Sequence, residues 1–163
     1  MSRSVLVLTL LTSLAVAETP RFELDGNTLK TPPVTYQTAK AKLTPASDPA
    51  ITHVAAYLEA KSSISTLRIE VHSDNQGNDK ANQALTEARA LAVAKALVAK
   101  GVDCKRLIAV GFGATKPVAP NDTPENKAAN RRTLFVNAAL RGKAIGGMPL
   151  DGNGQVAGDP CGK

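Results

Sequence analysis

Two residues of opposite charge have the types and the spacing to form a binding site. Asp74 directly follows an apolar–polar run that predicts a strand, and Arg89 lies within a helical pattern. At about 100° per residue, Arg89 falls between Leu85 and Val93, on the stripe expected to face the core. A guanidinium removed from water needs an acceptor-rich partner. A carboxylate fits best because it accepts two parallel hydrogen bonds.

The partner of Arg89 could come from the chain or from a ligand. In the first interpretation, Asp74 and Arg89 form an internal pair that only ties a strand to a helix. In the second, Arg89 binds a ligand carboxylate and Asp74 faces a ligand ammonium, while N–H groups of residues 75–79 bind the second carboxylate oxygen at a helix start. That set would fit an amino-acid zwitterion. Spacing alone does not decide between the two.

The elements that would position these residues follow from hydrophobic periodicity. The predicted class is α+β, a β-α-β-α-β-β two-layer sandwich with two helices packed on one mixed sheet. One helix is predicted to start at Ser47-Asp48-Pro49, capped by Ser47 or Asp48, and the other to end at Gly101. The helices cover 50–62 and 79–100, and the strands 34–43, 66–73, 106–113 and 131–140. A hairpin turn is predicted at Asp25-Gly26-Asn27, and a loop rich in Pro and Asn before the last strand.

The chain divides into four predicted parts. Residues 1–17 resemble a cleavable signal peptide, with a basic start, a short apolar stretch and an Ala-x-Ala end, so an exported chain without a transmembrane segment is expected. Residues 18–32 are a short extension or hairpin, 33–142 form the domain, and 143–163 are an irregular tail rich in Gly and Pro. In an oxidising compartment, Cys104 and Cys161 could form a disulfide that staples the tail to the domain. The alternative is a buried Cys104 and a free Cys161.

Composition argues against several functions. The net charge of +6 is spread along the chain and aromatic residues are only 3%, so no nucleic-acid partner is expected.

The strand at 66–73 should be half-buried, with Arg68, Glu70 and His72 on the side away from the core. His72, Ser73 and Asp74 alternate between faces and cannot converge as a catalytic triad. His53 has no metal-binding neighbours, and both histidines are expected at the surface or its boundary. We therefore predict no enzyme activity, no metal and no cofactor.

The ordered motif around these residues resembles the OmpA C-terminal-like domain family, a peptidoglycan-binding module also found in Pal lipoproteins and flagellar stator proteins. The resemblance spans residues 66–137. Its first half rests on Ser73-Asp74, Gly77, Asn82, Leu85-Thr86 and Arg89-Ala90. Its second half rests on Gly101, Arg106-Leu107, Gly111-Phe112-Gly113, Pro117, Asn121, Thr123 and Asn130-Arg131-Arg132.

The resemblance implies that Asp74 and Arg89 bind the diaminopimelate of the peptidoglycan peptide stem. By the same transfer, Asn82 and Leu85 would line or brace the pocket, and Ser73 would keep the hydroxyl of the family's usual Thr. Arg131 would either assist nearby or form a salt bridge at the strand end.

Two segments depart from the family pattern. Residues 36–43 lack the family's Phe-Asp pattern, and Asn126-Lys127 replaces its Gly-Arg.

The function implied by the resemblance is non-covalent peptidoglycan binding that anchors or organises the cell envelope, in the periplasm and in association with the outer membrane. The alternative is an envelope protein–protein interaction module with an internal Arg89–Asp74 pair.

Overall fold

The elements are taken from a computed structural model that describes residues 21–145 and 153–162. The predicted signal peptide and the first residues of the predicted extension lie outside the described residues. The helices are α1 (Asp48–Ala60), α2 (Asp79–Ala99) and α3 (Pro124–Asn130), with 3-10 turns η1 (Pro45–Ser47) and η2 (Cys104–Arg106). The strands are β1 (Leu24–Asp25), β2 (Thr28–Leu29), β3 (Ile64–His72), β4 (Leu107–Gly113), β5 (Thr133–Leu140), β6 (Lys143–Ala144) and β7 (Gln155–Val156).

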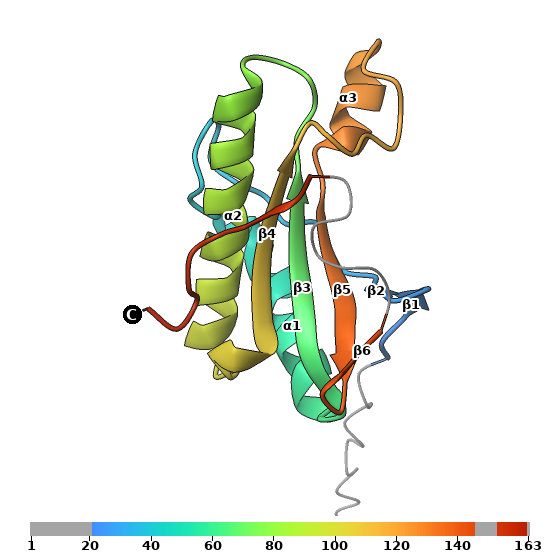
Figure 1. Cartoon of the computed structure of the whole chain (residues 1–163), viewed down its shortest axis with the longest axis vertical. Coiled ribbons are helices and arrows are strands. Elements are labelled where there is room, and N and C mark those ends of the chain that lie inside the picture. Colours follow the sequence, from blue (N-terminus) through green and yellow to red (C-terminus); the bar gives the residue numbers. More distant parts are fainter. Residues whose placement is uncertain (1–20, 146–152, 163) are drawn as a thin grey trace, which may run out of the picture.

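The strands of the described chain form one mixed sheet (Figure 1) in the order β1-β2-β5-β3-β4-β7, with β6 paired to β5. Strands β3 and β4 run parallel and are connected through α2, while β5 lies antiparallel on the other side of β3. The carboxyl ends of β3 and β4 therefore meet the start of β5 at one end of the sheet, where His72 pairs with Gly113 and Val71 with Thr133. Helix α3 lies at this same end (Figure 1).

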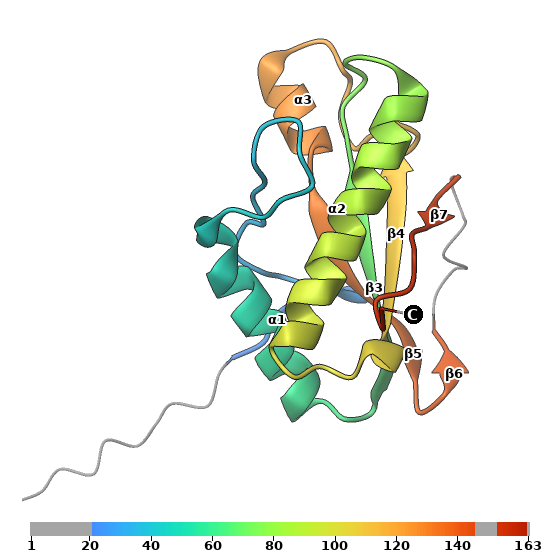
Figure 2. The same cartoon turned by 90° about the vertical axis from the view of Figure 1, so that its left-hand side faces the viewer.

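Helices α1 and α2 cover one face of the sheet (Figure 2), and the apolar core lies between them and the strands. Their buried stripes pack against the apolar residues of β3. The main members are Ile51, Val54 and Leu58 of α1, Ala90, Val93, Ala94 and Leu97 of α2, and Leu67, Ile69 and Val71 of β3. This arrangement confirms the predicted α+β sandwich with two helices on a mixed sheet.

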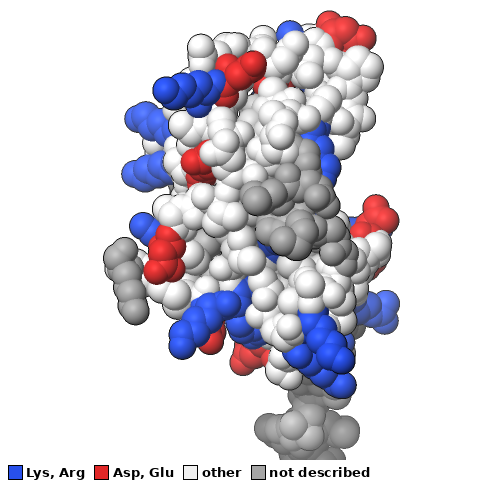
Figure 3. Space-filling model, viewed as in Figure 1, with Lys and Arg blue, Asp and Glu red and all other residues white. Residues whose placement is uncertain are grey.

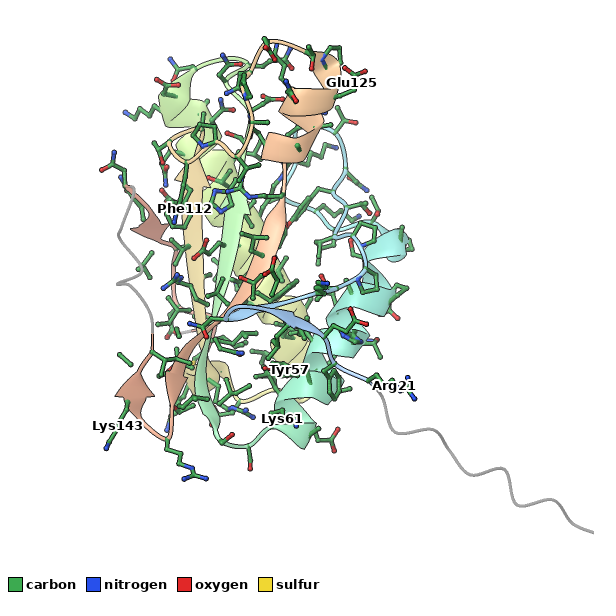
Figure 4. The ribbon with its side chains drawn as sticks, turned by 90° about the vertical axis from the view of Figure 1, so that its right-hand side faces the viewer. Arg21, Tyr57, Lys61, Phe112, Glu125 and Lys143 are labelled. Atoms are coloured by element: carbon green, nitrogen blue, oxygen red, sulfur yellow. A yellow bond between two sulfur atoms is a disulfide. The ribbon has the colours of Figure 1, made fainter. Side chains whose placement is uncertain are left out.

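The other face of β3 is buried too, so the prediction of a half-buried strand is wrong, as is the prediction of a surface or boundary position for His72. The exposed fractions of Arg68, Glu70 and His72 are 9%, 3% and 2%. They can be buried because Glu70 accepts from Arg68 Nε at 2.6 Å and contacts His72 Nε2 at 3.3 Å, and because the His72 ring stacks on Phe112 with centroids 4.7 Å apart. Figure 4 shows Phe112 on the opposite side of the sheet from Tyr57, a member of the apolar core.

Residues 34–43 do not form the predicted strand. They make only an isolated bridge between Tyr36 and Leu43, and the chain reverses between them with Ala39 at a φ of 55°. Helix α1 starts at Asp48 as predicted, but the Ser47 hydroxyl does not cap it, because that hydroxyl accepts from the Thr35 N–H at 2.8 Å and donates to the Thr35 carbonyl at 2.7 Å. The segment is therefore a loop attached to the start of α1.

The two ends of the described chain extend the sheet. The predicted hairpin is present as β1 and β2, with Gly26 in the left-handed conformation that its turn requires. The tail was predicted to be irregular, but it contributes β6 and β7, and β7 pairs antiparallel with the β4 edge. A disulfide joins Cys104 and Cys161, so the thiols are not free.

The loop between β4 and β5 contains α3, which was not predicted. Thr123 caps this helix by accepting a hydrogen bond from the Asn126 N–H at 3.1 Å, and Pro124 occupies its first turn.

No helix in the described ranges is both long and apolar enough to cross a membrane. Figure 3 shows acidic and basic side chains mixed over one face of the molecule, without a large patch of a single sign. This distribution matches the dispersed charge of the sequence.

Candidate functional site

A cavity of about 270 Å³ lies at the end of the sheet where β3 finishes and β5 starts. Its lining comes from the loop after β2, the end of β3, helix α2 and the start of β5. The lining residues are Val34, Thr35, Tyr36, Val71, His72, Arg89, Arg131, Arg132 and Thr133. Three of them are arginines and none is acidic, so the cavity favours an anion.

Four other cavities in the described chain are larger, and none of them is lined by a predicted site residue. Two, of about 620 and 580 Å³, lie between α1 and the connection from α2 to β4 and beside residues 42–48. The other two, of about 520 and 620 Å³, lie beside the start of α2 and beside β7. Because the smaller cationic cavity is lined by Arg89 and Arg131, it is the candidate.

Arg89 reaches the cavity from the edge of the buried stripe of α2. It is half-buried rather than core-facing as predicted, because Thr86, Ala90 and Val93 occupy the stripe itself. Its Nε donates to the Lys40 carbonyl at 3.0 Å. Its guanidinium carbon lies 4.6 Å from the centre of the Tyr36 ring.

Burial lowers the pKa of Arg89 below its ordinary value, and the neighbouring Tyr36 acts in the opposite direction. An arginine nevertheless stays protonated. Within the described chain no carboxylate pairs with it, so Arg89 carries an unbalanced positive charge into the cavity.

Asp74 follows β3 directly and is buried, with 5% of its surface exposed. Its Oδ2 pairs with Arg131 Nη1, and its Oδ1 accepts the Gln76 N–H at 3.0 Å. The Arg89–Asp74 pair proposed as the structural alternative is therefore not formed; Arg131 takes that place. Asp74 does not line the cavity itself but is linked to it through Arg131.

The remaining predicted site residues, Asn82, Ser73 and Leu85, do not line the cavity. Asn82 braces the loop after β3, since its Nδ2 donates to the carbonyls of Gln76 at 2.8 Å and Asp74 at 3.4 Å. Ser73 is buried, and its hydroxyl has no hydrogen-bond partner in the described ranges. Leu85 is half-buried one turn before Arg89 and does not line the cavity.

The backbone donors predicted at residues 75–79 are partly occupied. The Asn75 N–H donates to Asn121 Oδ1 at 3.3 Å, and the Gln76 N–H is bound by Asp74. At the helix start, the Ala81 N–H is bound by the Asn78 side chain at 3.2 Å. These donors hold the loop together, so the prediction that they bind a ligand carboxylate is wrong for residues 75 and 76.

Asn130 supports the loops around the site, although periodicity gave no sign of it. It is fully buried, and its side chain donates to the Ala119 carbonyl and to Asn121 Oδ1, both at 2.9 Å. Asn121 accepts from the Asn75 N–H, so the loop before α3 is tied to the loop that carries Asp74. The only sequence signal for this network was the family motif that contains both asparagines.

Tyr36 lines the cavity, although periodicity did not indicate it as a site residue. Its hydroxyl lies 2.9 Å from Thr133 Oγ1, and burial raises its pKa to about 12. The phenol is therefore neutral at physiological pH.

Arg132 lines the cavity, but its guanidinium is occupied elsewhere. It donates to the carbonyls of Lys116 at 3.1 Å and Asn130 at 3.3 Å. Because Arg131 is paired with Asp74, Arg89 is the guanidinium of this site whose terminal nitrogens are left for a ligand.

The three arginines of the lining suit the site to ion pairing. His72 lines the cavity, but its Nε2 contacts Glu70 and its pKa is lowered by burial. His53 is half-buried on α1 and lines none of the cavities described above. The described ranges hold no group of three or more metal-binding side chains.

The curated relatives of this chain include an outer-membrane protein and a peptidoglycan-binding protein. Outer membrane porin F of Pseudomonas aeruginosa is 40% identical over 119 residues, which cover 72% of this chain and 31% of the porin. Peptidoglycan-binding protein ArfA of Mycobacterium tuberculosis is 36% identical over 104 residues, or 64% of this chain and 32% of ArfA. The chain thus spans about a third of the length of either relative.

A solved structure and a family model agree with these relatives. The cell wall anchor of the T6SS from Pseudomonas aeruginosa superposes with a TM-score of 0.56 at 30% identity, over 64% of this chain and 74% of the anchor. Residues 35–131 match the model of the OmpA family. Because this match covers more than half of the 163 residues and agrees with the fold and the site motif, the chain belongs to the OmpA family.

Proposed function

We propose that this chain binds peptidoglycan non-covalently through the diaminopimelate of the stem peptide, and so anchors or organises the cell envelope. Arg89 would bind a carboxylate of that residue, and Asp74 would bind its ammonium. The observation that carries the proposal is the guanidinium of Arg89, which lines the cavity and has no acidic partner in the described chain.

The relatives support this function and its location. ArfA is named for peptidoglycan binding, the T6SS protein is a cell wall anchor, and porin F is an outer-membrane protein. We propose a periplasmic location in association with the outer membrane, reached through the predicted signal peptide at 1–17. OmpA-family members are structural and anchoring proteins rather than enzymes, which fits a cavity without catalytic groups.

The carboxylate and the ammonium of the ligand would bind to residues that differ in whether they already have a partner. A carboxylate entering beside Arg89 finds an unpaired guanidinium, and each hydrogen bond to a charged group contributes roughly 1.5–3 kcal/mol. An ammonium must share Asp74 with Arg131 or displace it. Sharing is feasible because a carboxylate has about four acceptor positions, of which Gln76 and Arg131 take two.

The test is a pull-down of the mature chain on purified sacculi, with free meso-diaminopimelate as competitor. Arg89→Ala should weaken binding by roughly 10- to 100-fold, about the loss of one charge-assisted hydrogen bond, and Asp74→Asn should weaken binding by less. Free meso-diaminopimelate should displace the wild-type chain.

Lys95→Ala is the matched control, because Lys95 is an exposed cation on the same helix that does not line the cavity. It should bind as the wild type does. Urea unfolding of every variant separates lost binding from lost folding. Wild-type binding by folded Arg89→Ala and Asp74→Asn would contradict the site. Binding to sacculi without competition by diaminopimelate would leave peptidoglycan as the ligand but exclude this part of the stem.

A further inference from the structure

Arg89 is held on two sides by the loop between β2 and α1. The Tyr36 ring lies against the guanidinium at 4.6 Å, and the Lys40 carbonyl accepts from Nε at 3.0 Å. A stacked ring contacts the flat face of a guanidinium, while a bond to Nε fixes its rotation within that plane. Together the two contacts limit the tilt and the rotation of the group.

The loop is itself fixed to the rest of the fold. The Tyr36 hydroxyl forms a hydrogen bond with Thr133 on β5. The hydroxyl of Ser47, which lies at the start of α1, donates to the carbonyl of Thr35 in the loop. These bonds attach the loop to the sheet and to a helix.

A tight turn in this loop presents the Lys40 carbonyl. The Lys40 N–H donates to the Gln37 carbonyl at 3.0 Å, and Ala39 adopts a φ of 55°, where glycine would be the usual residue. An alanine in this conformation carries backbone strain, so the turn is held by its surroundings.

The contacts leave one edge of the guanidinium for a ligand. Nε is used by the Lys40 carbonyl, and the terminal nitrogens of Arg89 have no hydrogen-bond partner in the described ranges. Two parallel N–H groups on that edge match the two oxygens of a carboxylate. A carboxamide offers only one acceptor oxygen and turns an NH₂ donor toward the other N–H group, so it cannot make the second bond.

We infer that Tyr36 is a positioning residue, which holds the Arg89 guanidinium flat so that the site selects a free carboxylate over the corresponding carboxamide. This inference rests on the proposed function and adds to it the chemical form of the ligand. Without the ring, the guanidinium can rotate to make a single bond, which either group can accept. Tyr36 therefore determines selectivity more than it determines binding.

The experiment compares two soluble stem peptides by calorimetry. They differ only in whether the side-chain carboxyl of diaminopimelate is a free acid or a carboxamide. The wild-type chain should bind the acid at least about tenfold more tightly, the value of roughly one hydrogen bond to a charged group. Tyr36→Leu should reduce this ratio by roughly 2- to 30-fold, the range that a cation–ring contact accounts for.

Tyr36→Phe and Thr133→Val are the matched controls. Each removes the hydrogen bond between Tyr36 and Thr133 but keeps the ring, so the ratio should equal that of the wild type within the error of the measurement. A merely structural role of Tyr36 would weaken both peptides equally and leave the ratio unchanged, which would overturn the inference. Should Tyr36→Leu unfold, Tyr36→Met, which fills similar space without a ring, replaces it.

The outcomes distinguish a failure of this inference from a failure of the proposed function. Failure of the wild-type chain to bind either peptide would overturn the proposed function. Equal binding of both peptides by the wild-type chain would overturn only the inference about selectivity. A preference for the acid that is kept in Tyr36→Phe and reduced in Tyr36→Leu is the expected result.

Discussion

The disulfide between Cys104 and Cys161 should provide a large share of the stability of this chain. The two residues are 57 positions apart, and the loop they close contains β4, α3, β5 and the tail. Closing a loop of this length in the unfolded chain should stabilise the fold by about 4 kcal/mol at 25 °C on the chain-entropy model. With a urea dependence of about 2 kcal/mol per molar, the unfolding midpoint should fall by about 2 M urea on reduction.

Urea unfolding of the mature chain followed by circular dichroism, with and without a reductant, measures this shift. A variant with both Cys104→Ala and Cys161→Ala should unfold like the reduced protein and should not respond to the reductant. Local detachment of the tail should appear as faster hydrogen exchange at the Ala157 amide, which donates to the Ala109 carbonyl at 2.8 Å beside β7. Equal midpoints for the oxidised and reduced protein would refute the loop-closure reasoning.

Three further predictions concern the packing around the sheet. Gly111→Ala should lower the free energy of unfolding by about 1–3 kcal/mol in urea titrations, because a Cβ there would overlap the backbone of Glu87 on α2. Thr86→Val should cost about 1–3 kcal/mol in the same assay, because it leaves the buried Gly113 N–H, now 2.9 Å from the Thr86 hydroxyl, without an acceptor. Stability should also fall as the pH drops below 6.5, because burial lowers the pKa of His72 in the fold and the unfolded chain then binds the proton first. His72→Gln should flatten this dependence in unfolding curves taken between about pH 7.5 and 5, and an unchanged slope would count against it.

Local patterns in the sequence predict the elements that carry the site. Helix α2 and strands β3 and β4 each bury an apolar stripe against one layer, and such a stripe is visible as periodicity. The hairpin is visible for a different reason, since its turn needs a residue such as Gly26. In these cases the residues that determine the element lie within its own segment of the sequence.

Elements that depend on distant partners could not be predicted in this way. Residues 34–43 alternate loosely like a strand, but they are held as a loop by bonds from Tyr36 to Thr133 and from Ser47 to Thr35. Helix α3 is short, and the network of its last residue, Asn130, ties it to a neighbouring loop. Strand β7 pairs with β4, a strand that lies far away in the sequence.

The pairing of charges at the site was the least predictable feature. The sequence shows that Asp74 and Arg89 belong to one motif, but it does not show that Arg131 is the residue that pairs with Asp74. Similarly, alternation along β3 suggested a solvated side for Glu70, which is instead buried with two partners. Both outcomes depend on which cation the fold brings within a few ångströms, and periodicity carries no such information.

This pairing determines how the two ends of a zwitterion would be recognised. In the free chain Asp74 is buried and satisfied by Arg131 and Gln76, so it attracts an incoming ammonium only weakly. Arg89 is oriented by Tyr36 and lacks a counter-charge in the described chain, so an incoming carboxylate needs no rearrangement there. Binding should therefore start with the carboxylate at Arg89, and the ammonium should follow as Arg131 shares or releases Asp74. A ligand with an ammonium but no carboxylate lacks the first step, and for that reason the charge of Arg89 matters more to recognition than the charge of Asp74.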